Sequence, residues 1–265
     1  MNQHLSYIHP DAKLAEGVVV EPFTTIAADV VIGEGTWIGP NVTIMDGARI
    51  GKNCRVFPGA VISAIPQDLK FQGERTTAEI GDDTTIRECV TVNRGTVARG
   101  KTTIGSNCLL MAYVHVAHDC KIGNNCILVN AVQVAGEVNI DDWAIIGGHS
   151  AIHQFVNIGG HVMVSGGSLL RKDVPPYVKA GRDPVSYAGI NAIGLRRRAI
   201  EADKIKIIQD IYRIIFQQKM NVTQALEIVE KEIPNCPEKE YIVTFFRNSK
   251  RGVIKGYNSG SSEDI

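Results

Sequence analysis

The sequence lacks a segment that could cross a membrane or direct export. No apolar run reaches the roughly 18 residues of a membrane-spanning helix. The first ten residues, MNQHLSYIHP, contain neither the basic n-region nor the apolar h-region of a signal peptide. We therefore expect a cytoplasmic protein that is not an integral membrane protein. Its 265 residues, 44% of them apolar, are enough to bury a substantial core.

The chain also lacks an excess of charge of either sign. Its 28 Lys and Arg residues balance 28 Asp and Glu residues, so no overall field attracts nucleic acid or an anionic membrane. We expect no nucleic-acid partner, and any charged partner must be bound by a local group of side chains. Cysteine is scarce as well. The six Cys residues form no CxxC pair and no cluster with zinc-ligand spacing, which argues against a metal or redox site.

What the sequence has in abundance is a six-residue repeat of aliphatic side chains. From Ile8 to Leu170, 25 of the 28 positions spaced by six carry Ile, Val or Leu, and the exceptions are Asp68, Glu74 and Ala98. Chance does not hold one phase for that long. The pattern predicts a solenoid in which the chain turns a corner every six residues.

A class of small residues occupies the position four residues after each aliphatic. A narrow coil with a corner every six residues has room for only a small side chain beside the large inward one. Four of the six cysteines fall at this position: Cys54, Cys108, Cys120 and Cys126. We interpret these thiols as structural.

Three hexads make a triangular coil of 18 residues, so residues 18 apart stack at about the 4.8 Å spacing of neighbouring strands. This pattern resembles the left-handed parallel β-helix of hexapeptide-repeat proteins, and the handedness is taken from that resemblance. We expect the β-helix to span residues 1–190. The phase is interrupted near residues 63–79 and 94–101, where we expect loop insertions, which on a rigid scaffold are common functional sites.

The period changes after residue 190, and we expect a C-terminal helical domain over residues 191–256. Apolar residues recur there at helical spacing, and Asn221 and Gln224 are placed like a capping box ahead of a second helix. A third helix is expected to begin near Pro237. Residues 257–265 are expected to be a disordered tail.

Two histidines, His115 and His118, lie three residues apart in VHVAHDC. Stacking by 18 places His118, Gly136 and Gln154 in one column on successive coils. A neutral imidazole accepts a proton near pH 7, and a backbone N–H on the coil above can stabilise an oxyanion. Asp119 can orient the imidazole only at a corner, because adjacent strand residues point to opposite faces. The alternative is that both histidines are hydrogen-bonded turn residues.

Zinc is a further alternative for these histidines. Hexapeptide-repeat carbonic anhydrases bind zinc through three histidines, two of which are five residues apart, whereas His115 and His118 are three apart. We therefore predict no metal site.

Longer motifs extend the resemblance to one family. The segments GDDTTIRECVTVNRGT, LLMAYVHVAHDC, AIIGGHSAIHQF and DVPPYVKAG, with a QDLK loop between coils, closely resemble the UDP-N-acetylglucosamine O-acyltransferases that begin lipid A synthesis in Gram-negative bacteria. The resemblance covers nearly the whole chain. It implies transfer of an (R)-3-hydroxyacyl group from acyl carrier protein to the glucosamine 3-hydroxyl of UDP-N-acetylglucosamine. It also implies a homotrimer with sites between subunits and no bound cofactor, since phosphopantetheine arrives on the carrier protein.

The resemblance also implies roles for individual residues. His118 is the general base, Asp119 orients it, and the N–H of Gly136 stabilises the tetrahedral oxyanion. Gly166 lies where the family has its acyl-chain ruler, and a glycine there leaves room for a long chain. The other substrate-binding residues implied are Asp68, Lys70, Asn93, His115, His153, Gln154, Asn191, Arg197 and Arg198.

The uridine and phosphate end would be met by Asn191, Arg197 and Arg198, since guanidinium groups suit phosphate. Without the resemblance, the sequence pattern favours a solvated helix face for the run Arg196–Arg198.

Three positions depart from the family pattern. Relatives usually have His at the position of Asn93 and often have His at the position of Glu137. Ile193 stands where a Glu is expected. We expect some acceptor contacts near Asn93 and Glu137 to differ, which leaves open whether a 3-amino sugar nucleotide competes.

Two other functions fit the repeats. One is a coenzyme A dependent small-molecule acetyltransferase, which is common on this fold. The other is a non-enzymatic β-helix scaffold, which would not explain the column of His118, Gly136 and Gln154.

Overall fold

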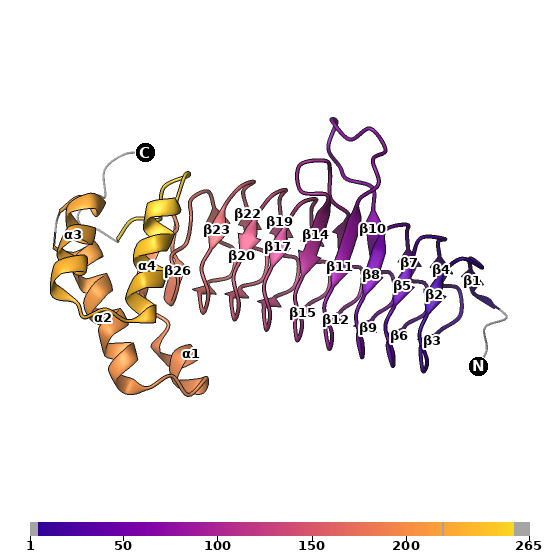
Figure 1. Ribbon diagram of the computed structural model, residues 1–265, viewed down its shortest axis with the longest axis horizontal. Coiled ribbons are helices and arrows are strands. Elements are labelled where there is room, and N and C mark those ends of the chain that lie inside the picture. Colours follow the sequence, from indigo (N-terminus) through magenta and orange to yellow (C-terminus); the bar gives the residue numbers. More distant parts are fainter. Residues whose placement is uncertain (1–4, 219, 257–265) are drawn as a thin grey trace.

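The protein is a long triangular prism of stacked coils with a group of helices at its C-terminal end (Figure 1). The computed structural model describes residues 5–218 and 220–256, and the tail expected at 257–265 lies outside them. Short strands form three sheets of nine, eight and ten strands, one on each face of the prism. All pairs are parallel except the last one, β26 with β27.

The sheets are here named faces A, B and C. Face A contains β1 (Tyr7–Ile8), β4 (Thr25–Ile26), β7 (Thr43–Ile44), β10 (Val61–Ala64), β13 (Thr91–Asn93), β16 (His115–Val116), β19 (Gln133–Val134), β22 (Ala151–Ile152) and β25 (Leu169–Leu170). Face B contains β2 (Lys13–Leu14), β5 (Val31–Ile32), β8 (Ala48–Ile50), β11 (Thr77–Ile80), β14 (Lys101–Ile104), β17 (Lys121–Ile122), β20 (Asn139–Ile140) and β23 (Asn157–Ile158). Face C contains β3 (Val19–Val20), β6 (Trp37–Ile38), β9 (Arg55–Val56), β12 (Thr85–Ile86), β15 (Leu109–Leu110), β18 (Ile127–Leu128), β21 (Ile145–Ile146), β24 (Met163–Val164), β26 (Val178–Gly181) and β27 (Ser186–Ile190).

The repeat positions build the core. Aliphatics such as Ile62, Leu110 and Leu128 are fully buried, and partners 18 residues apart pair in register, as His115 does with Gln133. The small position four residues later is also buried, and Cys54, Cys108, Cys120 and Cys126 are free thiols there. Burial raises the pKa of the Cys120 thiol to about 12, so it remains a neutral thiol at pH 7, in agreement with a structural role.

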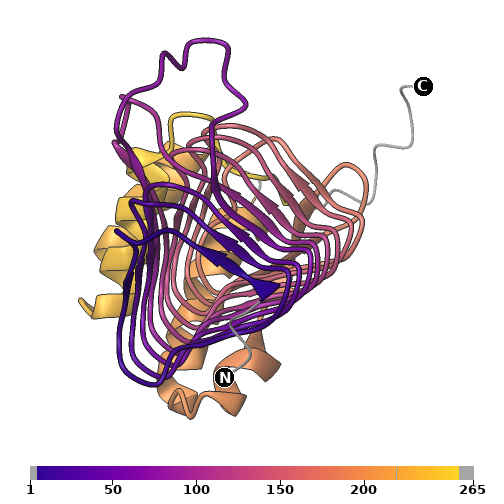
Figure 2. The same cartoon turned by 90° about the vertical axis from the view of Figure 1, so that its right-hand side faces the viewer.

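Both expected insertions leave the prism at the edge between faces A and B. Loop 65–76 connects β10 to β11, and loop 94–100 connects β13 to β14. Both loops project from this one corner of the cross-section (Figure 2). The two loops therefore lie beside the coil whose corner carries His118, between β16 and β17.

Four helices follow the prism: α1 (Ala192–Arg197), α2 (Ala202–Gln217), α3 (Val222–Glu232) and α4 (Pro237–Asn248). The capping box of Asn221 and Gln224 is present at the start of α3, as the sequence predicts. The helices are joined to the β-helix by Tyr212, which is fully buried and donates its hydroxyl proton to the carbonyl of Pro176 at 2.6 Å.

Candidate active site

The imidazole of His118 is oriented by the side chain that follows it. His118 and Asp119 form a corner between faces A and B, and Asp119 has a left-handed backbone with φ of 59°. This corner turns both side chains the same way, so His118 Nδ1 lies 2.8 Å from Asp119 Oδ2. The geometric condition set by the sequence is met, because the pair is not in a strand.

The other ring nitrogen of His118 is unoccupied. Within the described residues Nε2 forms no hydrogen bond, and Oδ2 of Asp68 lies 4.0 Å from it, which is too long for one. Loop 65–76 of the same chain brings Asp68 to this place, and the second oxygen of Asp68 accepts the N–H of Lys70 at 3.0 Å. Nε2 can therefore accept a proton from a ligand in the space beside it.

Gly136 lies one coil above His118, and Gln154 one coil above Gly136. Two backbone bonds fix this column, from Glu137 N–H to the His118 carbonyl at 3.0 Å and from Phe155 N–H to the Gly136 carbonyl at 3.2 Å. A Cβ on Gly136 would lie 2.7 Å from Nε2 of His118, so only glycine leaves the ring in place. Within the described residues, no acceptor bonds the N–H of Gly136.

A groove of about 420 Å³ runs along this column and is open to solvent. Its lining includes Gln67, His115, Ala117, His118, Gln133, Ala135, Gly136 and Gln154. His115 shares a hydrogen with the Thr91 hydroxyl across 2.7 Å. Burial and, secondarily, His118 lower the pKa of His115, so His115 is neutral at pH 7. The groove therefore offers uncharged hydrogen-bonding side chains and small apolar walls beside His118.

The chain was compared with known proteins. A family model described as UDP-N-acetylglucosamine O-acyltransferase, domain 2, matches residues 173–254, and one for bacterial transferase hexapeptide repeats matches residues 29–64 and 101–136. An acyl-[acyl-carrier-protein]–UDP-N-acetylglucosamine O-acyltransferase from Trichlorobacter lovleyi is 50% identical over 261 residues, which cover 97% of this chain and 100% of the relative. The enzyme of the same name from Chlorobaculum parvum is 58% identical over 206 residues, 76% of this chain and 77% of that one. The chain belongs to the UDP-N-acetylglucosamine O-acyltransferase family.

The solved structures agree with this assignment. The crystal structure of a UDP-N-acetylglucosamine acyltransferase from Bacteroides fragilis is 54% identical to this chain, with a TM-score of 0.94, and covers 96% of this chain and 100% of that one. The resemblance stated from the motifs is thus confirmed, and so is the fold, a left-handed parallel β-helix followed by C-terminal helices.

The residues that the family resemblance implies for substrate binding lie at three different edges of a single prism. Asp68, His115, His153 and Gln154 lie at or beside the A–B edge with His118, while Gly166 is at a corner between faces C and A. The side chain of Lys70 is exposed on loop 65–76, and that of His153 is exposed with Nδ1 3.1 Å from its neighbour's carbonyl oxygen.

The third edge, between faces B and C, holds Asn191 and Arg198. Asn191 donates to the carbonyl of His161 at 2.9 Å, and Arg198 donates to the carbonyl of Trp143 at 3.1 Å. Burial and, secondarily, Arg198 lower the pKa of His161 to about 4, so this imidazole is neutral beside the guanidinium. Arg196 and Arg197 are exposed, which agrees with the solvated-face interpretation for these two residues but not for Arg198.

The three departures from the family pattern differ in their surroundings. Asn93 is 2% exposed and donates to the carbonyl of Ile65, where loop 65–76 begins. Glu137 follows the glycine of the column, and Ile193 is exposed on α1. Asn93 thus contacts the loop that carries Asp68.

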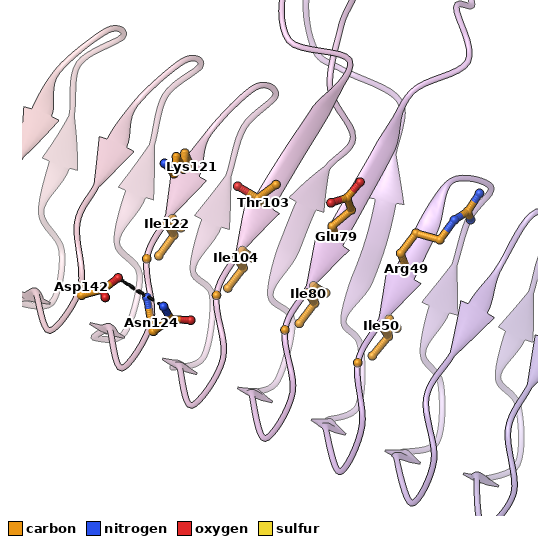
Figure 3. A pocket seen from close by; sticks show the side chains of 14 residues that line it. Arg49, Ile50, Glu79, Ile80, Thr103, Ile104, Lys121, Ile122, Asn124 and Asp142 are labelled. Atoms are coloured by element: carbon orange, nitrogen blue, oxygen red, sulfur yellow. Dashed lines mark hydrogen bonds between the residues drawn. The ribbon is translucent and has the colours of Figure 1, made fainter.

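A larger hollow of about 670 Å³ lies on the outer surface of face B (Figure 3). Stacked corner glycines, among them Gly51, Gly105 and Gly123, form its floor, because a Cβ at any of them would come within 2.8 Å of the next coil. Its labelled polar side chains, including Glu79, Thr103 and Lys121, form a solvated ladder along the strands. Its lining residues include no imidazole and no thiol, unlike the groove beside His118.

Residues 5–218 and 220–256 contain neither a metal-ligand cluster nor a membrane-spanning helix. No three His, Cys, Asp or Glu side chains gather there in a way that suits a metal ion. In the same residues, no helix has the length and apolarity needed to span a bilayer.

Proposed function

We propose that this chain transfers an (R)-3-hydroxyacyl group from acyl carrier protein to the glucosamine 3-hydroxyl of UDP-N-acetylglucosamine, the first step of lipid A synthesis. The relatives named above carry this donor and acceptor in their names. The observation that supports the proposal is the arrangement around His118: buried Asp119 holds Nδ1, and Nε2 lies against Gly136. Within the described residues, neither Nε2 nor the N–H of Gly136 forms a hydrogen bond.

These groups suffice for the chemistry. Nε2 of His118 takes the proton of the sugar hydroxyl as its oxygen attacks the thioester carbonyl. The N–H of Gly136 donates to the oxyanion of the tetrahedral intermediate. Collapse breaks the carbon–sulfur bond, and the imidazolium returns its proton to the leaving thiolate of phosphopantetheine. Throughout these steps Asp119 holds the His118 ring in place and stabilises the imidazolium. The steps balance without a resident cofactor or metal.

The remaining roles are part of the same proposal. Asp68, Lys70, His115 and Gln154 contact the sugar nucleotide, and His153 supports this end of the groove. Asn93 acts through loop 65–76, because its side chain bonds the carbonyl of Ile65.

Two features of the single chain support a homotrimer as part of this proposal. Face C carries an outward row of apolar side chains on successive coils, Leu109, Ile127, Ile145 and Met163. The corresponding positions on face B are Glu79, Thr103, Lys121 and Asn139. An apolar row of this length favours contact with another subunit.

The second feature is the scatter of site residues. A single substrate would have to span a whole face, about 20 Å for six strand residues, to touch both His118 and Arg198. Packing face C of one subunit beside the A–B edge of the next brings Gly166, Asn191, Arg197 and Arg198 of one chain to His118 of the other. Threefold closure satisfies every such contact. Acyl carrier protein and UDP-N-acetylglucosamine are then the partners, in the cytoplasm.

The direct test is to identify the product by mass spectrometry. Purified protein given 3-hydroxyacyl carrier proteins of several chain lengths and UDP-N-acetylglucosamine should form the 3-O-acyl nucleotide. His118→Ala should lower kcat by about 10² to 10⁴, the contribution of a general base, while the matched control His9→Ala, on the first coil, should not. Equal use of coenzyme A thioesters would favour the acetyltransferase, and no transfer from either donor would favour the scaffold.

A further inference from the structure

The carboxylate of Asp119 is held by a loop that the mechanism above does not use. Asp119 is fully buried, and within the described residues no Lys or Arg forms an ion pair with it. Its oxygens instead accept hydrogen bonds from loop 94–100. Thr96 donates its hydroxyl proton to Oδ2 at 2.7 Å and its N–H to both oxygens at 3.0 and 3.2 Å, and the N–H of Arg99 donates to Oδ1 at 3.1 Å.

The direction of these bonds is fixed. A backbone N–H can only donate, and the Thr96 hydroxyl oxygen already accepts the N–H of Ala98 at 3.2 Å, which leaves its own hydrogen for Asp119. Every group that meets the carboxylate from loop 94–100 is therefore a donor. A carboxylate in such surroundings stays an acceptor, so the hydrogen between it and His118 belongs to Nδ1. The lone pair of the neutral ring is then on Nε2, which faces the groove.

We propose that Thr96 is a positioning residue that sets the tautomer and orientation of His118 through Asp119. This inference rests on the proposed function, in which Nε2 of His118 is the general base. Thr96 touches neither substrate nor the reacting atoms in this arrangement. Its hydroxyl bonds Asp119, and Asp119 in turn bonds Nδ1 of His118, so Thr96 acts on Nε2 through two successive hydrogen bonds.

Further contacts keep loop 94–100 in place independently of the Thr96 hydroxyl. The guanidinium of Arg99 donates to Oδ1 of Asn139 at 2.7 Å and to the carbonyl of Glu137 at 3.3 Å. The N–H of Val97 donates to Oε1 of Glu74 at 3.2 Å, which joins this loop to the one that carries Asp68. Removing only the hydroxyl should therefore leave the loop folded while weakening its hold on Asp119.

The test is Thr96→Val, which keeps the shape and the N–H of Thr96 but removes the hydroxyl. We expect kcat to fall about tenfold to a hundredfold, the effect of losing one hydrogen bond to a charged group, with an unchanged KM for the sugar nucleotide. ¹⁵N NMR of histidine-labelled protein should show His118 shifting from the Nδ1–H tautomer toward a mixture. Thr96→Ser should restore both. Thr84→Val, which removes a fully buried hydroxyl at another edge, is the matched control and should change neither.

The outcomes separate this inference from the proposed function. Full kcat and an unchanged tautomer in Thr96→Val, alongside an inactive His118→Ala, would overturn the role of Thr96 alone. A loss of kcat with no change of tautomer and no rescue by serine would show a merely structural threonine and would also overturn it. Turnover retained in His118→Ala would instead remove the base on which both proposals depend.

Discussion

At the scale of residues, the six-residue period predicts the column but not what holds it. His118, Gly136 and Gln154 stack because they are 18 apart, and the corner that pairs His118 with Asp119 follows from the same count. The contact of Asp119 with Thr96 spans 23 residues and crosses no whole number of coils. An insertion breaks the register, so the period gives no information about its contacts.

The six-residue period also separates residues that the motif resemblance places in one site. Gly166 comes 48 residues after His118, which is not a multiple of 18 and therefore places it at another edge. The motif resemblance groups these residues in one site, and a single prism separates them. The assignments of individual site residues stay predictions that mutation must test.

Gly136→Ala tests the column at this scale. The new Cβ would sit 2.7 Å from Nε2 of His118, and the ring must move by several tenths of an ångström to restore an ordinary contact. A displacement approaching 1 Å at a reacting group lowers kcat by about 10²-fold. Steady-state kinetics should show this loss with an unchanged unfolding temperature. Gly39→Ala, equally tight against Trp37 but in an N-terminal coil, should retain full kcat, and an active Gly136→Ala would argue against the column.

At the scale of elements, the structure adds two features that the repeat cannot show. The antiparallel pair of β26 and β27 follows the end of the hexads, where no period of six remains. Helix α1 has only six residues, too few for a helical pattern to be recognised. The longer helices are predicted by the spacing of their apolar residues and, for α3, also by a capping box. The division into a β-helix over 1–190 and a helical domain over 191–256 stays a prediction.

Lys239 stabilises the link between α3 and α4. Its side chain is buried, and Nζ donates to the carbonyls of Glu230 and Ile233 at 2.8 and 2.7 Å and to Asn235 at 3.2 Å. Lys239→Met should destabilise these helices by about 2–3 kcal/mol, because the acceptors at the end of α3 lose a charged donor. Hydrogen exchange of α3 and α4 measures this. The exposed Lys231→Met on α3 should change stability by less than about 0.5 kcal/mol; similar protection in both variants would contradict the proposed capping role.

At the scale of the whole molecule, a single prism brings together only some of the residues proposed for the site. In the proposed mechanism, the A–B edge carries the general base, the N–H that meets the oxyanion and the loop with Asp68, whereas Arg198 at the B–C edge and Gly166 at the A–C edge lie elsewhere on the prism. The apolar row on face C explains how separate chains would join these parts. Spacing within one chain cannot predict such an arrangement, because the proposed contacts lie between copies of the chain.

The measurement that tests this account most directly is a crystal structure with the 3-O-acyl product of UDP-N-acetylglucosamine bound. The account predicts the ester oxygen within hydrogen-bonding distance of Nε2 of His118 and its carbonyl oxygen toward the N–H of Gly136. The uridine end should lie against Arg198 of a neighbouring subunit in a threefold assembly. Product bound with its ester away from His118, or held entirely within the hollow on face B, would contradict it.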